Sequence, residues 1–169
     1  ENVLTSVQFE RLISTSSPTQ GLPIRVSDGK RMGKIAFIQC VGSRDPSCGQ
    51  DHCSTICCMY ATKQAMIAKE RSPGLGVTFF YMDIRPMGKE YERYYERAKS
   101  EYGIEYIRSA ISSIKELQQT KNLLLTYVKE NGTFEEREFD AVILSVGFTP
   151  PQTIKDLAQK MGLRLNQQG

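Results

Sequence analysis

The sequence predicts an α/β fold built on an open, mainly parallel sheet with an inserted β-meander. Two short apolar runs, residues 34–39 and 77–82, are typical of strands buried on both faces, and a helical segment at residues 54–71 separates them. Three further strand-like segments follow one another between residues 110 and 139, joined by short turns. A strand–helix–strand unit predicts parallel pairing, whereas consecutive hairpins predict an antiparallel meander.

The N-terminal region, residues 1–33, suggests a peripheral connector. Thr5 and Gln8 fit a capping box that opens a short helix through residues 9–13, and residues 16–21 are rich in turn formers. Both ends of the chain look cut, which predicts a piece of a larger polypeptide.

The remaining elements follow in a regular order. The small side chains of Ala61, Ala65 and Ala68 give the first long helix a stripe that can pack close to a sheet, and Pro73 and Gly74 end that helix. After the second buried strand we expect, in order, a helix at 89–102, strands at 105–107, 110–116, 123–129, 134–139 and 140–146, and a helix at 153–161. Turns at 119–122 and at Asn131-Gly132 favour hairpins.

Length and composition set the class of protein. The 169 residues allow one ordinary domain with a substantial core, and 40% hydrophobic and 24% charged residues are typical of a globular chain. No apolar run approaches the roughly 18–20 residues that span a bilayer, and no export signal is present, so we expect a cytoplasmic protein. The net charge of +3 comes from interspersed acids and bases, which argues against a nucleic-acid surface.

The cysteines are the most specific signal in the sequence. Cys40, Cys53, Cys57 and Cys58 have the spacing C-x12-C-x3-C-C, with Cys48 in the intervening loop. We expect Cys53 and Cys57 to share one face of a helical turn and Cys40 to arrive from the end of the first buried strand, so that four sulfurs converge. A helix start stabilises thiolates, and four thiolates are the expected ligand set of an iron–sulfur cluster. We therefore predict a cluster site and a role in electron transfer.

Other interpretations of the cysteines fit the sequence less well. A disulfide framework is disfavoured by the odd number of cysteines and the missing export signal. A structural zinc site usually has two C-x2-4-C knuckles, which the adjacent Cys57 and Cys58 do not supply. Core cysteines alone would not crowd into one loop, although Cys48 fits an ordinary loop thiol. His52 is interpreted as an exposed polar neighbour of the site rather than a ligand.

A nucleotide-binding fingerprint is missing where this fold class would carry it. The turn after the first buried strand supplies a single glycine, Gly42, instead of the G-x-G-x-x-G pattern that lets backbone approach a pyrophosphate. Asp83 lies where a ribose-binding acid would lie. We interpret the chain as a dinucleotide-binding scaffold whose phosphate site has been replaced by a metal cluster. A genuine NAD(P)H-binding reductase domain with redox-active cysteines, and a structural zinc module, remain the alternatives.

Several segments carry a resemblance to a known family. They are residues 2–6, 9–12, 34–45, 53–54, 57–61, 80–85 and 144–147. These segments closely resemble the A subunit of heterodisulfide reductase and its bacterial relatives. The resemblance implies a fold like the NAD(P) domain of thioredoxin reductase, inserted in an FAD-type domain. It assigns residues 1–33 to a connector and part of the FAD-type domain, 34–147 to the cluster-bearing domain, and 148–169 to a return segment.

The resemblance also implies cofactors and partners. Cys40, Cys53, Cys57 and Cys58 match the motif that holds a 4Fe-4S cluster near the flavin, and Cys48 matches no ligand. FAD is implied for the full-length protein, with Gly147 as the one candidate contact here, so this chain alone should bind flavin poorly. Expected partners are other heterodisulfide reductase-like subunits and ferredoxin or hydrogenase-type electron donors, and a homodimer is compatible with the family. No residue is assigned a catalytic role.

Overall fold

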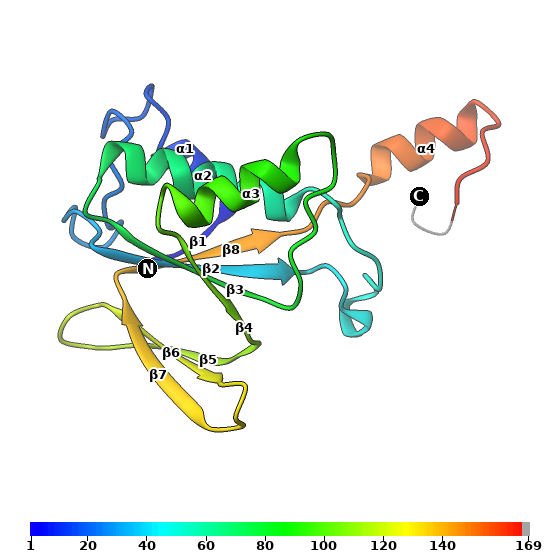
Figure 1. Cartoon of the computed structure of the whole chain (residues 1–169). Helices are drawn as coiled ribbons and strands as arrows, with labels where there is room; N and C mark the ends of the chain where they lie inside the picture. Colours follow the sequence, from blue (N-terminus) through cyan, green and yellow to red (C-terminus); the bar gives the residue numbers. More distant parts are fainter. Residues whose placement is uncertain (167–169) are drawn as a thin grey trace.

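The main layer of the protein is a parallel sheet. The computed structural model describes residues 1–166 and contains five parallel strands in the order β1-β8-β2-β3-β4 (Figure 1). The strands are β1 (Val3–Thr5), β2 (Lys34–Val41), β3 (Gly76–Tyr81), β4 (Glu105–Arg108) and β8 (Ala141–Val146). This arrangement confirms the predicted α/β class with a mainly parallel sheet.

Helices cover one face of this sheet and the meander covers the other (Figure 1). The helical layer consists of α1 (Ser6–Leu12), α2 (Cys57–Arg71) and α3 (Tyr91–Ser100). Phe37 and Phe79 are fully buried toward the helices and stack with their ring centroids 4.7 Å apart. The adjacent Ala36 and Phe80 are buried toward the meander. Because successive strand residues point to opposite faces, both faces of β2 and β3 are apolar, as their sequences predict.

The meander forms a separate antiparallel sheet in the order β5-β6-β7. Its strands are β5 (Ile111–Glu116), β6 (Leu123–Val128) and β7 (Phe134–Phe139). Leu123, Leu125 and Tyr127 alternate along β6 and are buried against the main sheet, which leaves the intervening residues partly exposed. The predicted meander is therefore confirmed, with one apolar face and one polar face.

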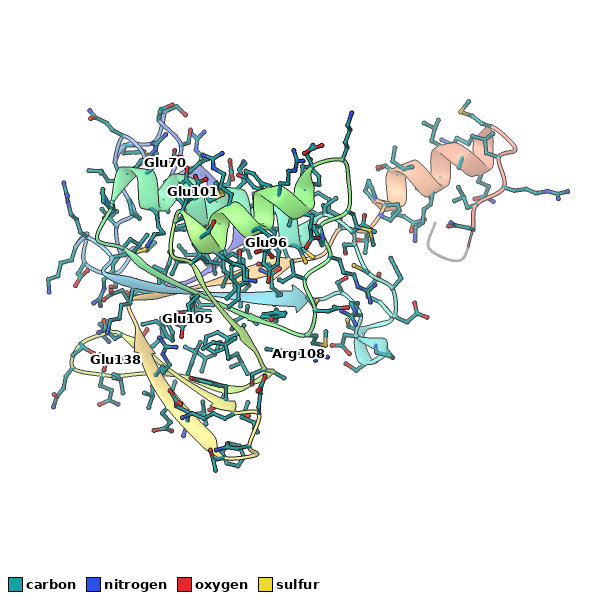
Figure 2. The ribbon with its side chains drawn as sticks, in the orientation of Figure 1. Glu70, Glu96, Glu101, Glu105, Arg108 and Glu138 are labelled. Carbon is teal, nitrogen blue, oxygen red and sulfur yellow. The ribbon has the colours of Figure 1, made fainter. Side chains whose placement is uncertain are left out.

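Charged side chains lie outside these cores and connect the two sheets. Figure 2 marks Glu70 and Glu101 in the helical layer and Glu105 beside the strands. The Glu105 carboxylate accepts hydrogen bonds from Thr78 Oγ1 (2.8 Å) and Arg137 Nη1 (2.9 Å). Glu105 thereby ties β4 to β3 within the main sheet and to β7 in the meander.

The first strand and helix differ from the expected peripheral connector. Leu4 in β1 is buried, β1 pairs with β8 at the edge of the main sheet, and Phe9 in α1 is fully buried. The predicted capping box at Thr5 and Gln8 is present at the start of α1. This segment therefore belongs to the main sheet and its core. The three domain boundaries stay a prediction, and the last three residues of the 148–169 segment lie outside the described residues.

Several element boundaries differ from those predicted. Helix α2 begins at Cys57 rather than at residue 54, and α3 is shorter at both ends than the predicted 89–102. Helix α4 (Gln152–Lys160) extends away from the two sheets (Figure 1), and a short 3-10 helix at Pro46–Cys48 was not predicted. Within residues 1–166, no helix has the length and apolarity that a bilayer crossing requires.

Candidate metal centre

Four of the five cysteines lie at the carboxyl end of the parallel sheet. Cys40 is near the end of β2, Cys57 and Cys58 are the first two residues of α2, and Cys53 lies in the loop between them. In Figure 1 this loop leaves the end of β2 and returns to α2. Ligands in open α/β sheets bind at this edge, because loops from several strands meet there.

A bulge in β2 sets the direction of Cys40. Ile38 pairs with Leu144 and Val41 with Val146, so β2 has one more residue between these pairs than β8 has. Within this bulge Cys40 adopts a left-handed conformation, with φ of 62°. Bulges commonly redirect a side chain beside a functional site, and a non-glycine residue with positive φ is energetically unfavourable. The backbone thus bears strain at the position of the first predicted ligand.

The loop after Cys40 contains further left-handed residues. Arg44 and Thr55 have φ of 58° and 63°, and Gly42 and Gly49 have φ of 64° and 72°. The turn at Thr55 interrupts helical backbone, which is why α2 starts after it. The expectation that Cys53 shares a helical turn with Cys57 was therefore wrong, because Cys53 belongs to the loop.

Two serines hold this loop against the end of β8. Ser43 Oγ donates to His52 O (3.0 Å) and accepts from Ser54 N (3.1 Å) and from Ser54 Oγ (3.0 Å). Ser54 Oγ also accepts from Phe148 N (3.2 Å). A Cβ on Gly147 would lie 2.5 Å from Ser54 Oγ and 2.9 Å from Ser43 Cβ. Gly147 therefore has a packing role here, and its contact with FAD stays a prediction.

Cys57 and Cys58 form a buried pair of thiols. They are 1% and 4% exposed. The Cys57 thiol donates to the Cys58 sulfur, which lowers the pKa of Cys58 to about 7 and, together with burial, raises the pKa of Cys57. Burial and the neighbouring Cys58 raise the pKa of Cys40, while Arg44 acts in the opposite direction. The pair therefore holds one proton tightly and releases the other near neutral pH.

The cysteines influence one another electrostatically without forming a compact single-ion site. The neighbouring thiols of Cys58, Cys40 and Cys53 each raise the pKa of Cys57. All five cysteines are free thiols. Within residues 1–166, no three side chains of His, Cys, Asp or Glu lie close enough together to hold one metal ion. The convergence of the four sulfurs on one point therefore stays a prediction, and the structure shows the cysteines on three neighbouring segments of chain.

The start of α2 has no side-chain cap. Its flanking residue Ile56 makes no capping hydrogen bond, so the first amides of a 15-residue helix have no side-chain acceptor. Such amides carry the positive end of the helix dipole and favour negative charge. One turn in, Tyr60 Oη donates to Val146 O (2.6 Å) and accepts from Ser6 Oγ (3.1 Å), which fixes α2 to the ends of β8 and β1.

Charged residues beside the cysteines were not recognised from the sequence as part of the site. Asp83, just after β3, forms ion pairs with both Arg44 and Arg85. Burial alone would raise the pKa of Asp83, but hydrogen bonds from Arg85 and Arg44 outweigh it and lower that pKa. The signal available in the sequence was a basic residue shortly after each of two neighbouring parallel strands.

Cys48 and His52 occupy a different part of the loop. Cys48 is exposed at the end of the 3-10 helix, where its Sγ donates to Asp45 O (3.3 Å). His52 Nδ1 lies 3.6 Å from the Asp51 carboxylate. Cys48 therefore contacts its own turn, whereas the other four cysteines face the ends of the sheet and α2.

Comparison with known proteins gives relatives over nearly the whole chain. No protein-family model matches it. It is 49% identical over 151 residues to an iron-sulfur A subunit of CoB–CoM heterodisulfide reductase from Methanopyrus kandleri, covering 89% of this chain and 23% of that protein. It is 42% identical over 171 residues to the A subunit of H(2):CoB-CoM heterodisulfide,ferredoxin reductase from Methanothermobacter thermautotrophicus, covering 99% and 26%. The chain thus spans about a quarter of the length of the curated relatives it matches.

Solved structures share the fold at low sequence identity. Histamine dehydrogenase from Rhizobium sp. 4-9 matches with a TM-score of 0.54 at 11% identity, over 95% of this chain and 20% of that one. Lysine monooxygenase NbtG from Nocardia farcinica, reported with an unprecedented NADPH domain conformation, matches with a TM-score of 0.51 at 12% identity, over 99% and 43%. These matches confirm the fold and are too distant to indicate function.

Proposed function

Because this chain belongs to the family of the heterodisulfide reductase A subunit, we propose that it is an electron-transfer segment of a longer oxidoreductase. In this proposal Cys40, Cys53, Cys57 and Cys58 bind a 4Fe-4S cluster. When bound, such a cluster supplies one-electron transfer, and the protein sets its potential through burial and hydrogen bonds. The observation that carries the proposal is the gathering of these four thiols at one edge of the sheet, with Cys48 left out.

A cluster and a single zinc ion differ in the spacing of the sulfurs that they require. A single zinc ion with Zn–S bonds of about 2.3 Å needs sulfurs about 3.8 Å apart. A four-iron cluster binds each thiolate through a different iron, so its ligands stand farther apart. The sulfurs here come from a strand end, a loop and a helix start, and no three of the described ligand-type residues form a single-ion group. Because the hydrogen-bonded Cys57 and Cys58 sulfurs lie close together, the choice of the cluster over zinc rests on the family of the chain rather than on the spacing of the sulfurs.

The surrounding residues suit a buried anionic group. Cys57 and Cys58 are almost fully buried, so water is kept from two of the four sulfurs. The uncapped start of α2 offers amide donors, and donors to cluster or ligand sulfurs raise a reduction potential. The Arg85 backbone amide lies on the side of Cys58 and helps to lower the pKa of that thiol. In this proposal these residues hold and tune the group, and none acts as acid, base or nucleophile.

The cofactors and partners of the longer protein form part of the same proposal. The names of the relatives include ferredoxin, H(2) and CoB-CoM heterodisulfide. We infer that the longer protein binds FAD, assembles with other heterodisulfide reductase-like subunits, and exchanges electrons with ferredoxin or a hydrogenase-type donor.

An NAD(P)H-binding domain is the second candidate, because the fold resembles a structure with an NADPH domain. Two observations count against it. The turn after β2 has only one glycine where a pyrophosphate would approach, and the Asp83 carboxylate is already paired with two arginines. A ribose hydroxyl would have to compete with those guanidinium groups.

Anaerobic reconstitution tests the proposal. We expect the reconstituted chain to bind four irons and, after reduction, to give the EPR signal of a 4Fe-4S cluster. Cys57→Ser should lose most of the bound iron, whereas Cys48→Ser, in the same loop, should retain it. Equal iron binding by both variants would refute the ligand assignment.

Two further measurements separate the alternatives. Stoichiometric zinc in an anaerobic preparation, with no uptake of iron, would favour the structural zinc module. Tight binding of NADPH that survives Cys57→Ser would favour the reductase domain. Under the cluster proposal, we expect neither result.

A further inference from the structure

Two arginines and one carboxylate form a bridge beside the cysteines. Arg44 follows β2, Arg85 follows β3, and Asp83 pairs with both, its Oδ2 accepting from Arg85 Nε at 2.9 Å. Because β2 and β3 are neighbours in the sheet, the bridge joins two adjacent strand ends. We call these three residues the Arg–Asp–Arg bridge.

Each arginine of this bridge also lies beside a predicted ligand. Arg44 and Cys40 line the same cavity at the end of β2, and the Arg44 and Arg85 guanidinium groups interact electrostatically with the Cys40 and Cys53 thiols, respectively. These two cysteines are the ligands outside α2, and both lie on irregular backbone: the bulge in β2 and the loop before Thr55. The Cys53 sulfur also accepts a hydrogen bond from Thr55 N (3.3 Å), so the bridge acts beside a backbone contact at that ligand.

We propose that the Arg–Asp–Arg bridge positions Cys40 and Cys53 and raises the reduction potential of the bound cluster. This inference rests on the proposed function. Reduction adds one electron, supplied by an external one-electron donor, and no proton is moved by these residues. The bridge carries a net charge of +1, so it stabilises the more negative reduced state.

A purely structural ion pair would behave differently. The side chains of Arg44, Arg85 and Asp83 are 24%, 37% and 41% exposed. Ion pairs with this exposure contribute little to stability, and a purely structural one has no reason to shift a reduction potential. The charges also predict that the reduction potential shifts in opposite directions in the two kinds of variant. Loss of a guanidinium lowers the potential, whereas loss of the carboxylate charge raises it.

A potentiometric titration of the cluster-loaded chain, followed by EPR, tests this inference. We expect Arg85→Gln and Arg44→Gln each to lower the midpoint potential by about 59 mV, a tenfold change in the equilibrium constant of the one-electron couple. Asp83→Asn should raise it, and Arg85→Lys should stay nearer to wild type. Arg93→Gln is the matched control, since Arg93 is 87% exposed on α3 and its ion pair within residues 1–166 is with Glu90.

A second measurement covers variants that do not take up a cluster. In the cluster-free chain at alkaline pH, where thiols are ionised, alkylation of Cys53 by iodoacetamide should be several-fold faster in Arg85→Gln than in Arg93→Gln, because the sulfur is no longer held beside a guanidinium. Unshifted potentials in all three bridge variants would overturn the inference and leave the proposed function intact. For an Arg85→Gln chain that takes up no cluster, an alkylation rate of Cys53 equal to that of Arg93→Gln would also overturn the inference. A wild-type chain that binds no cluster would remove both proposals.

Discussion

The two ends of the parallel sheet differ in how their polar groups are satisfied. At the amino end, Asp140 Oδ2 accepts from the amides of Gly33 and Lys34, each at 2.7 Å. Arg25, 6% exposed, donates to Asn122 Oδ1 and Thr120 O, each at 2.5 Å, and so ties the N-terminal segment to the β5–β6 turn. Arg25 Nε makes no hydrogen bond within the described residues and instead forms an ion pair with Asp28 Oδ1 at 3.3 Å, so the polar groups at this end are mostly paired with one another.

At the carboxyl end, strained backbone and thiols occur beside polar pairs such as Ser43–Ser54 and Asp83–Arg85. Cys40, Arg44 and Thr55 have left-handed backbone, and α2 starts without a side-chain cap. Strain of this kind persists only where the surrounding structure enforces it, and it concentrates at functional sites. The contrast indicates that stability and ligand binding are assigned to opposite ends of the same sheet, and the following substitutions test that separation.

The largest effect is expected at the amino end. Arg25→Ala removes a nearly buried guanidinium and leaves the Asn122 and Thr120 acceptors unpaired, so we expect a loss of about 3 kcal/mol in the free energy of unfolding. Urea denaturation of the chain measures it. Iron bound per folded chain should stay at the wild-type value. A loss of iron at unchanged stability would contradict the separation of the two ends.

An intermediate effect is expected at Gly147. Gly147→Ala brings a Cβ to 2.9 Å from Ser43 Cβ and 3.0 Å from Gly42 O, which the backbone must relieve. We expect about 1–3 kcal/mol of destabilisation. Because the displaced loop carries Cys53, we also expect the folded variant to bind less iron than the folded wild-type chain. Melting temperature and iron content, measured on the same samples, separate the loss of stability from the loss of iron binding. As a control, Gly74→Ala adds a Cβ in open space without a positive φ and should leave iron content unchanged.

The smallest effect is expected at the start of α1. Thr5→Ala removes the capping hydrogen bond from Gln8 N to Thr5 Oγ1 (3.3 Å) and should cost about 1 kcal/mol. Although α1 starts at the same end of the sheet as α2, its cap is structural, so iron content should not change. Circular dichroism during thermal unfolding measures the loss. Reduced iron binding in this variant would mean that the capped helix also supports the site.

Local patterns predicted much of the fold. Residues 34–39 and 77–82 were recognised as buried strands because both of their faces are apolar, and the Asn131-Gly132 turn marked a hairpin of the meander. The pairing of β1 with β8 was not predicted. It joins Val3 to Val142 across almost the whole chain, and a three-residue strand has too few side chains to reveal its partner.

The candidate site was predicted in its chemistry and only partly in its geometry. The spacing of the cysteines separated Cys40, Cys53, Cys57 and Cys58 from Cys48, and the structure leaves Cys48 in its own turn. The helical turn expected at Cys53 does not form, because Thr55 adopts a left-handed conformation stabilised by the surrounding loop. Such a conformation is unusual for threonine, so its side chain gives no warning of it.

The sequence by itself therefore determined the kinds of elements and the kind of donor atoms, because hydrophobic periodicity and thiol chemistry are local properties. Only the tertiary structure decided how those donors are arranged. The bulge that turns Cys40 exists because β2 pairs with β8, and Arg44 and Arg85 meet at Asp83 because β2 lies beside β3. Strand order and register join residues far apart in the chain, and no local pattern specifies them.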